Sequence, residues 1–158
     1  MPNGMNIHLE EQLVLCKQAA VLHMRALDSF ARSLAQKIQK NGKTSSEAFN
    51  SIQVQSTQLA RAMAEHAALE SLIEYAQQST SDEFERQLSV LYSSQAIVDF
   101  AKLMSYDLAS VRAMSISELP DFFVAVGHLN NGLTPYAWAS LGNEILERER
   151  DPSGSQRL

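Results

Sequence analysis

Apolar residues recur at alternating steps of four and three along two long stretches of the chain. A step of four followed by a step of three returns to the same face of an α-helix, so each stretch predicts a helix with one apolar edge. Such an edge packs against another helix. The first edge consists of Leu9, Leu13, Cys16, Ala20, His23, Leu27, Phe30 and Leu34, and the second of Phe49, Ile52, Ser56, Leu59 and Met63.

The first stretch predicts a helix over about residues 7–40, ended by Asn41-Gly42, two residues that tolerate the left-handed cap. Its first half carries apolar side chains on several faces, which must all be covered. Either this helix runs through the middle of a bundle, or it meets a second copy of the chain in a homodimer. The expected oligomer interface consists of Leu13, Val14, Leu15, Val21 and Leu22.

Capping signals place the next two helices. Thr44-Ser45-Ser46-Glu47 and Thr80-Ser81-Asp82-Glu83 each have the composition of a capping box. The short connection before the first box predicts that the two helices it joins are antiparallel. The helix after the second box changes its apolar face near Ser93-Ser94, and we expect it to continue as one helix to about Met114.

The last third of the chain predicts a helical hairpin over residues 117–149. Pro120 suits the first turn of one helix, Gly132 its end, and Thr134-Pro135 the start of the other. The whole pattern predicts an all-α fold: an antiparallel helical bundle over 7–114 followed by this hairpin. We expect a single helical domain over residues 1–150 and a flexible tail over 151–158.

The composition agrees with this fold and indicates which class of macromolecule the chain could bind. The 158 residues include only 6 Gly and 4 Pro, which is too little turn chemistry for an all-β fold. The net charge is −5, and residues 80–158 carry 6 basic and 11 acidic side chains. An acidic surface disfavours direct binding to nucleic acid and favours a protein partner with a basic surface.

The single cysteine, Cys16, lies on the first apolar edge and is expected to be a small buried hydrophobe. One cysteine cannot form an internal disulfide, which fits a reducing compartment. The start of the chain has no basic leader, and its most apolar segment is interrupted by Lys17 and Gln18, so we expect no membrane span. These features predict a cytoplasmic protein.

One alternative function depends on two histidines and a methionine. In this alternative the bundle binds a small molecule, a metal or haem through His23, His66 and Met63. No glutamate has a histidine three residues later, as a di-iron bundle requires. With a turn near residue 42, the two histidines are expected to be offset by about 7 Å along the helices. Buried structural histidines are the favoured interpretation, with no metal and no cofactor.

Catalytic motifs are missing from the sequence. It contains no Gly-x-Ser-x-Gly elbow, Gly-rich phosphate loop or His-Glu-x-x-His zinc motif. His128 lies near Asp121 and Tyr136 in sequence, but a histidine beside a helix cap is the simpler interpretation. The sequence therefore predicts that the chain is not an enzyme.

Aromatic residues gather in the predicted hairpin, where they either close the end of the bundle or anchor a protein partner. We expect partner-binding residues at Phe122, Phe123, His128, Tyr136 and Trp138. The favoured function is a non-enzymatic interaction module, such as a regulator, inhibitor, chaperone or adaptor.

The spacing of Phe, Gln and Leu over residues 82–114 resembles that of phasins, the amphipathic helical proteins of polyester storage granules. That resemblance implies a second alternative, a coat on a lipid or polyester granule surface.

Overall fold

The computed structural model describes residues 3–40, 43–78, 80–106 and 119–150. Six helices and one pair of very short strands make up this part of the chain, which confirms the all-α prediction. In chain order the elements are α1 (Asn3–Ile38), β1 (Gln39–Lys40), β2 (Lys43–Thr44), α2 (Ser46–Ser51), α3 (Gln53–Ala76), α4 (Glu83–Tyr106), α6 (Leu119–Gly132) and α7 (Pro135–Arg150).

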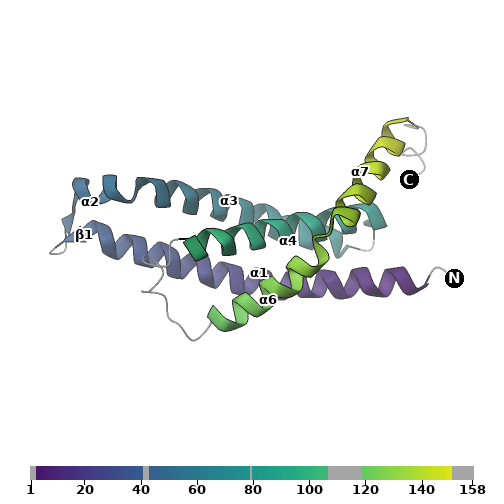
Figure 1. Ribbon diagram of the computed structural model, residues 1–158, viewed down its shortest axis with the longest axis horizontal. Helices are drawn as coiled ribbons and strands as arrows, with labels where there is room; N and C mark the ends of the chain where they lie inside the picture. Colours follow the sequence, from purple (N-terminus) through teal and green to yellow (C-terminus); the bar gives the residue numbers. More distant parts are fainter. Residues whose placement is uncertain (1–2, 41–42, 79, 107–118, 151–158) are drawn as a thin grey trace.

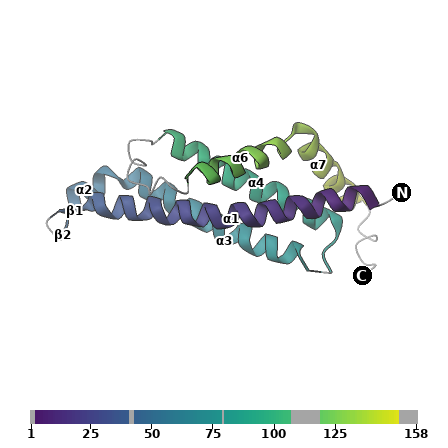
Figure 2. The same cartoon turned by 90° about the horizontal axis from the view of Figure 1, so that it is seen from below.

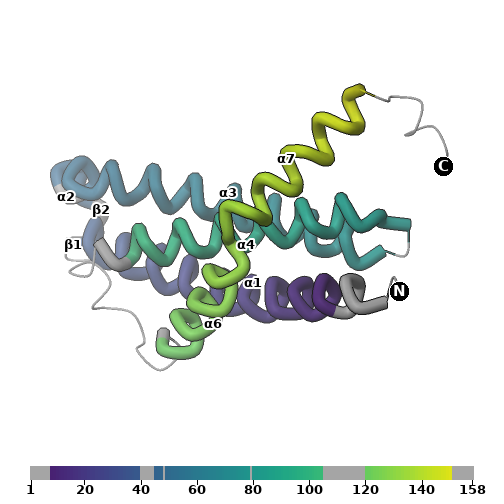
Figure 3. The backbone as a smooth tube through the Cα atoms, turned by 45° about the vertical axis from the view of Figure 1, so that its right-hand side comes forward, coloured from purple at the N-terminus to yellow at the C-terminus, as the bar shows by residue number. Residues whose placement is uncertain are grey.

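Three long helices form the body of the molecule. Helices α1, α3 and α4 run side by side along the long axis, and each packs against the other two (Figure 1). Helix α6 crosses α1 and α4 on a second side of this bundle, as the view from below also shows (Figure 2). Helix α7 packs on α4 and then leaves the bundle, pointing away from its axis (Figure 3).

The predicted apolar edge of α1 is confirmed. Seven of its eight residues are buried, and Leu9, the first of them, packs half-buried against the same core. The central helix, however, is α4 and not α1. Helix α4 buries residues around most of its circumference, from Val90 to Met104, whereas α1 leaves Val14, Leu15 and Val21 exposed.

The connection between α1 and α3 differs from the prediction. Lys40 belongs to β1, which pairs antiparallel with β2, and the Ser45 N–H donates to the Ile38 carbonyl at 2.9 Å. A break at Ile52, whose φ is −113° and ψ is 12°, then separates α2 from α3. The predicted cap at Asn41-Gly42 lies outside the described residues.

The helix boundaries further along the chain are closer to the prediction. Helix α4 passes through Ser93-Ser94 without interruption, and its predicted end near Met114 lies outside the described residues. Pro120 occupies the first turn of α6. Thr134 caps α7, because its Oγ1 accepts a hydrogen bond from the Ala137 N–H at 3.1 Å. Among the described helices, none is long and apolar enough to cross a membrane.

The second capping box lies two residues later than the sequence predicts. The Asp82 carboxylate accepts from the Glu85 N–H, and the Glu85 carboxylate accepts from the Asp82 N–H, both at 2.8 Å. Ser81 instead closes the end of α3 by donating to the carbonyls of Ala76 and Gln78. Asp82 is therefore the N-cap of α4, a position for which a carboxylate is strongly preferred.

Candidate functional site

Two histidines meet in the middle of the bundle. His23 of α1 and His66 of α3 are 1% and 3% exposed, and their Nδ1 atoms lie 3.0 Å apart. A single hydrogen bond between two imidazoles requires one nitrogen to donate and the other to accept. The pair therefore joins α1 to α3 through a buried polar contact.

Aromatic rings surround this pair. His23 lies edge-to-face with Phe100 of α4 at a centroid distance of 4.8 Å and parallel to Phe122 of α6 at 6.3 Å. Burial, followed by the effect of His66, lowers the pKa of His23 to about 3. His23 is therefore neutral at pH 7.

Glu70 extends the pair toward the surface. His66 Nε2 lies 3.3 Å from the Oε1 atom of Glu70, one helical turn later on α3. Among the described residues, neither His23 Nε2 nor His66 Nε2 has a hydrogen-bond partner, so the approach of His66 to Glu70 is not a hydrogen bond.

The predicted offset of 7 Å between the two histidines is wrong. The strand pair and the break at Ile52 use additional residues between α1 and α3, which shifts α3 relative to α1 and brings the two rings to a centroid distance of 4.9 Å. Met63 lies on the outside of α3 and is 45% exposed, so the three residues do not line one site. Among the described residues, no group of three His, Cys, Asp or Glu side chains could hold a metal ion.

A cavity of about 80 Å³ lies between α1, α4, α6 and α7. Cys16 is completely buried at this cavity, as the sequence predicts, with its Sγ 3.6 Å from Ser94 Oγ and 3.8 Å from the Val90 carbonyl. Burial raises the pKa of the Cys16 thiol, despite the opposing effect of its contact with Ser94. The thiol is therefore protonated and a poor nucleophile at pH 7. The cavity is lined by Gln12, Leu15, Cys16, Gln87, Val90, Leu91, Ser94, His128, Leu129, Gly132 and Ala137.

One of the five predicted partner-binding residues does not lie at the surface. Phe122 is 1% exposed and belongs to the core, whereas Phe123 and Trp138 are partly exposed and Tyr136 is 83% exposed. His128 is exposed and lines the cavity. The aromatic residues of the hairpin thus divide between the core and the surface.

The five predicted oligomer-interface residues divide in the same way. Leu13 is buried in the core of its own chain, and Leu22 packs half-buried against that core. Val14, Leu15 and Val21 remain exposed on α1.

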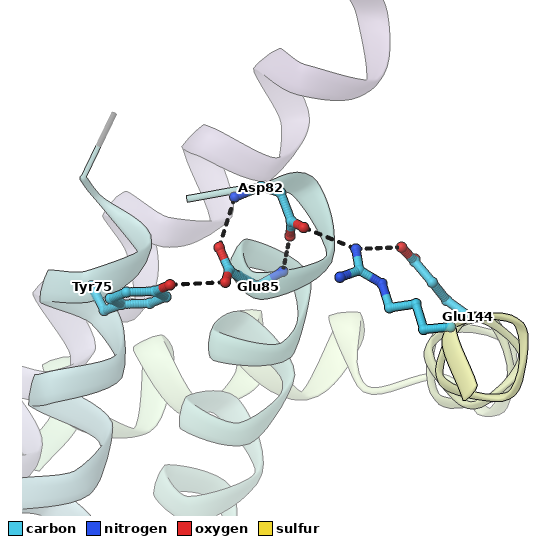
Figure 4. A network of polar contacts seen from close by, with 5 residues as sticks. Tyr75, Asp82, Glu85 and Glu144 are labelled. Carbon is cyan, nitrogen blue, oxygen red and sulfur yellow. Dashed lines mark hydrogen bonds and ion pairs between the residues drawn. The ribbon is translucent and has the colours of Figure 1, made fainter. Parts of the chain in front are cut away.

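A network of polar contacts that the sequence did not reveal joins the start of α4 to α7. Arg148 donates to Asp82 at 2.9 Å and to Glu144 at 3.1 Å (Figure 4). The Arg148 guanidinium also lies 4.2 Å from the centre of the Phe84 ring, which is cation–π distance. Tyr75 of α3 donates to Glu85 at 2.8 Å.

These contacts shift two pKa values in opposite directions. Desolvation alone would raise the pKa of Asp82, but the Glu85 N–H and the Arg148 guanidinium together lower it. The hydrogen bond to Glu85, and then the charge of Glu85, raise the pKa of Tyr75. Arg148 thus links α7 to the first turn of α4 at the surface, while Leu141 of α7 is buried.

A sequence model of the acyl-CoA oxidase family matches residues 11–119, more than half of the chain. The match includes α3, α4 and most of α1, together with both buried histidines and Cys16, and it ends at the first residue of α6. No curated protein and no solved structure matches the chain.

This match corrects the functional expectations from the sequence. A family of oxidases contradicts the prediction of a non-enzymatic interaction module and the prediction that the chain is not an enzyme. It equally replaces the two alternatives, a metal, haem or small-molecule bundle and a phasin-like granule coat. The prediction failed because apolar periodicity shows only which residues are buried. The same periodicity occurs in helical enzymes and in helical scaffold proteins.

Proposed function

The chain belongs to the acyl-CoA oxidase family, and on that basis we propose that it acts as the helical part of an enzyme that oxidises acyl-CoA thioesters. The single observation that carries this proposal is the match over residues 11–119, which covers the three-helix bundle. The bundle supplies a rigid scaffold, and rigid scaffolds hold catalytic and binding groups at fixed distances.

Oxidation of an acyl chain requires a group that accepts electrons, and enzymes take this chemistry from a cofactor. Besides the cavity of about 80 Å³, the described residues line surface hollows of about 270 and 260 Å³, whose walls include the charged side chains Arg61, Glu65 and Asp99 in one and Glu10 and Arg86 in the other. Pockets that enclose a drug-sized ligand measure roughly 300–1,000 Å³. None of these three hollows reaches that size, so we place the electron-accepting group in none of them.

Two further features belong to this proposal. We infer a cytoplasmic location, supported by a single cysteine that is buried and free. We also infer a homodimer through the exposed face of α1 that carries Val14 and Val21, because dimerisation would remove these apolar side chains from water. The domain is expected to extend over residues 1–150.

The test is to isolate the protein from the cells that make it, with bound groups and other chains retained, and to supply acyl-CoAs of different lengths. We expect oxygen uptake and peroxide formation that depend on the acyl-CoA. The same preparation from cells that lack the chain is the control for contaminating oxidases. Equal oxygen uptake in both preparations, at every acyl length, would contradict the proposed function.

A further inference from the structure

A row of exposed residues runs along α1 on the side that the bundle does not cover. Its members recur at alternating steps of four and three, so they share one edge of the helix, and they span about 27 Å at 1.5 Å per residue. Figure 2 shows α1 at the front of the bundle, with α3 and α6 on its two sides. This row, the outer edge of α1, consists of Glu10, Val14, Lys17, Val21, Met24 and Asp28.

The outer edge has the spacing and composition of a seam between two helices. Steps of four and three are those of the a and d positions of a coiled coil, where side chains of one helix pack between those of another. The apolar members Val14, Val21 and Met24 are each at least 44% exposed. The described part of the chain therefore leaves this edge in water, where a helix of another molecule could cover it.

The charged members of the edge determine the direction of that second helix. Lys17 carries a positive charge, and Glu10 and Asp28 carry negative charges near the two ends. In a parallel pair of identical helices each residue faces its own copy, so lysine would face lysine and aspartate would face aspartate. Such like-charge contacts are unfavourable. In an antiparallel pair each of these residues faces a different one, so opposite charges can meet.

One antiparallel register gives every residue a complementary neighbour. When Lys17 faces Asp28 of the second copy, Val21 faces Met24 of that copy, and two-fold symmetry repeats both contacts. A shift of seven residues in one direction would set Asp28 against Glu10, which are both carboxylates, and Lys17 against Val21. The opposite shift would set Asp28 against Met24. Charge complementarity thus favours the first register.

The side chains of Lys17 and Asp28 are available for this contact. Lys17 donates at 3.3 Å to Gln77, an uncharged acceptor, and is exposed. Asp28 accepts from Arg32 through Oδ2 at 2.7 Å, and its side chain is 53% exposed. Among the described residues Asp28 Oδ1 accepts no hydrogen bond, so a second cation can bind there.

We propose that two copies of the chain pack antiparallel through the outer edge of α1, with Lys17 of each copy against Asp28 of the other. The proposal rests on the homodimer inferred as part of the proposed function. It adds the direction of the two helices, their register, and the pair of charges that determines both. It does not depend on the oxidation of acyl-CoA.

Charge reversal at the two positions tests the arrangement. Lys17→Glu sets two carboxylates together at both contacts of a dimer, and Asp28→Lys sets two ammonium groups together. We expect each variant alone to dimerise at least about tenfold more weakly than wild type. Mixed in equal amounts, the two variants restore opposite charges at both contacts, and we expect a heterodimer of wild-type affinity.

Lys102→Glu on α4 is the matched control, because it makes the same charge change at another exposed lysine and is expected to dimerise like wild type. Analytical ultracentrifugation of the full chain measures each affinity, and circular dichroism verifies that each variant keeps its helicity.

Weak self-association of both variants, with recovery in the mixture, supports the antiparallel register. Wild-type affinity in either variant alone would overturn it, because Lys17 and Asp28 would then not face each other. Weak association that persists in the mixture would overturn it also. A monomeric wild type would overturn the dimer itself. None of these outcomes bears on the oxidation of acyl-CoA, which oxygen uptake measures independently.

Discussion

Phe122 and Phe123 are adjacent in the sequence and have opposite environments. Phe122 packs against Phe100 at a centroid distance of 6.3 Å and stacks on His23, while Phe123 lies on the exposed side of α6. Removal of a buried aromatic ring costs its burial energy and leaves a cavity behind. Removal of an exposed ring leaves no cavity.

We therefore predict that Phe122→Ala lowers the free energy of unfolding by about 3–5 kcal/mol. The neighbouring variant Phe123→Ala is the control, with an expected loss below about 1 kcal/mol. Urea denaturation followed by circular dichroism measures both. Similar losses in the two variants would show that α6 does not pack on the bundle through Phe122.

The buried imidazoles make stability depend on pH. The pKa of His23 is about 3 in the folded protein, below its ordinary value of 6.5. The unfolded chain therefore binds more protons than the folded one between these values, and stability falls as the pH falls from 6.5 toward 3. The titratable groups that face His23 are His66 and, beyond it, Glu70.

We predict that the double variant His23→Leu/His66→Leu flattens this dependence. A single proton difference corresponds to about 1.4 kcal/mol per pH unit, and the variant is expected to lose a slope of about this size. His128→Leu, at an exposed position, serves as the control and is expected to keep the wild-type slope. Unfolding free energies measured from pH 4 to 7 decide between these outcomes, and a wild-type slope in the double variant would be inconsistent with a neutral buried His23.

At the scale of elements, the polar network around Asp82 fixes α7 to the first turn of α4. Asp82 caps α4 and also accepts from Arg148, so one carboxylate serves two helices. The side chains of Arg148 and Asp82 are about half exposed, and exposed ion pairs contribute little to global stability. Their role is to set the position of α7.

We predict that Arg148→Gln lowers global stability by less than about 1 kcal/mol but increases hydrogen exchange in the second half of α7. Arg150→Gln, on the same turn, is the control. Acid should reproduce the effect in wild type, because the ion pair is lost as the pH falls through the lowered pKa of Asp82. Unchanged exchange in Arg148→Gln would mean that apolar contacts alone hold α7.

The sequence was enough to predict which segments form the long helices. It was not enough to predict how α1 connects to α3 or which residue caps α4. The apolar edge of α1 and the Thr134 cap of α7 are local patterns, and the structure confirms both. The cap of α4 depended on a competition between Thr80 and Asp82, two residues with similar capping propensity. The break at Ile52 has no local signal, because neither Gly nor Pro lies next to it and Ile52 continues the apolar pattern of a helix.

At the scale of the molecule, the cavity could not be predicted. Its lining residues come from four helices, and Cys16, Ser94 and His128 are far apart along the chain. Sequence periodicity shows that a residue is buried but not which distant residue it contacts. The sequence placed His23 and His66 on neighbouring helices but gave the wrong register, because the register depends on the length of chain used in the connection.

We predict that the chain forms a homodimer in solution through the exposed face of α1. Val21→Glu should convert it to a monomer, because a charge would then be buried in the interface without a partner. Val54→Glu on α3 changes another exposed valine and is expected to remain dimeric. Light scattering measures the mass of each variant, and a monomeric wild type would contradict the dimer.

The contact between His23 and His66 constrains how this sequence can vary over evolution. Replacement of either histidine by an apolar residue would leave the other with a buried nitrogen lacking its partner, at a cost of about 1–3 kcal/mol. Replacement of both together would remove that cost. Positions 23 and 66 are therefore expected to change as a pair among descendants of the same ancestor, and a lineage that has lost only one of them should carry a compensating substitution near Phe100.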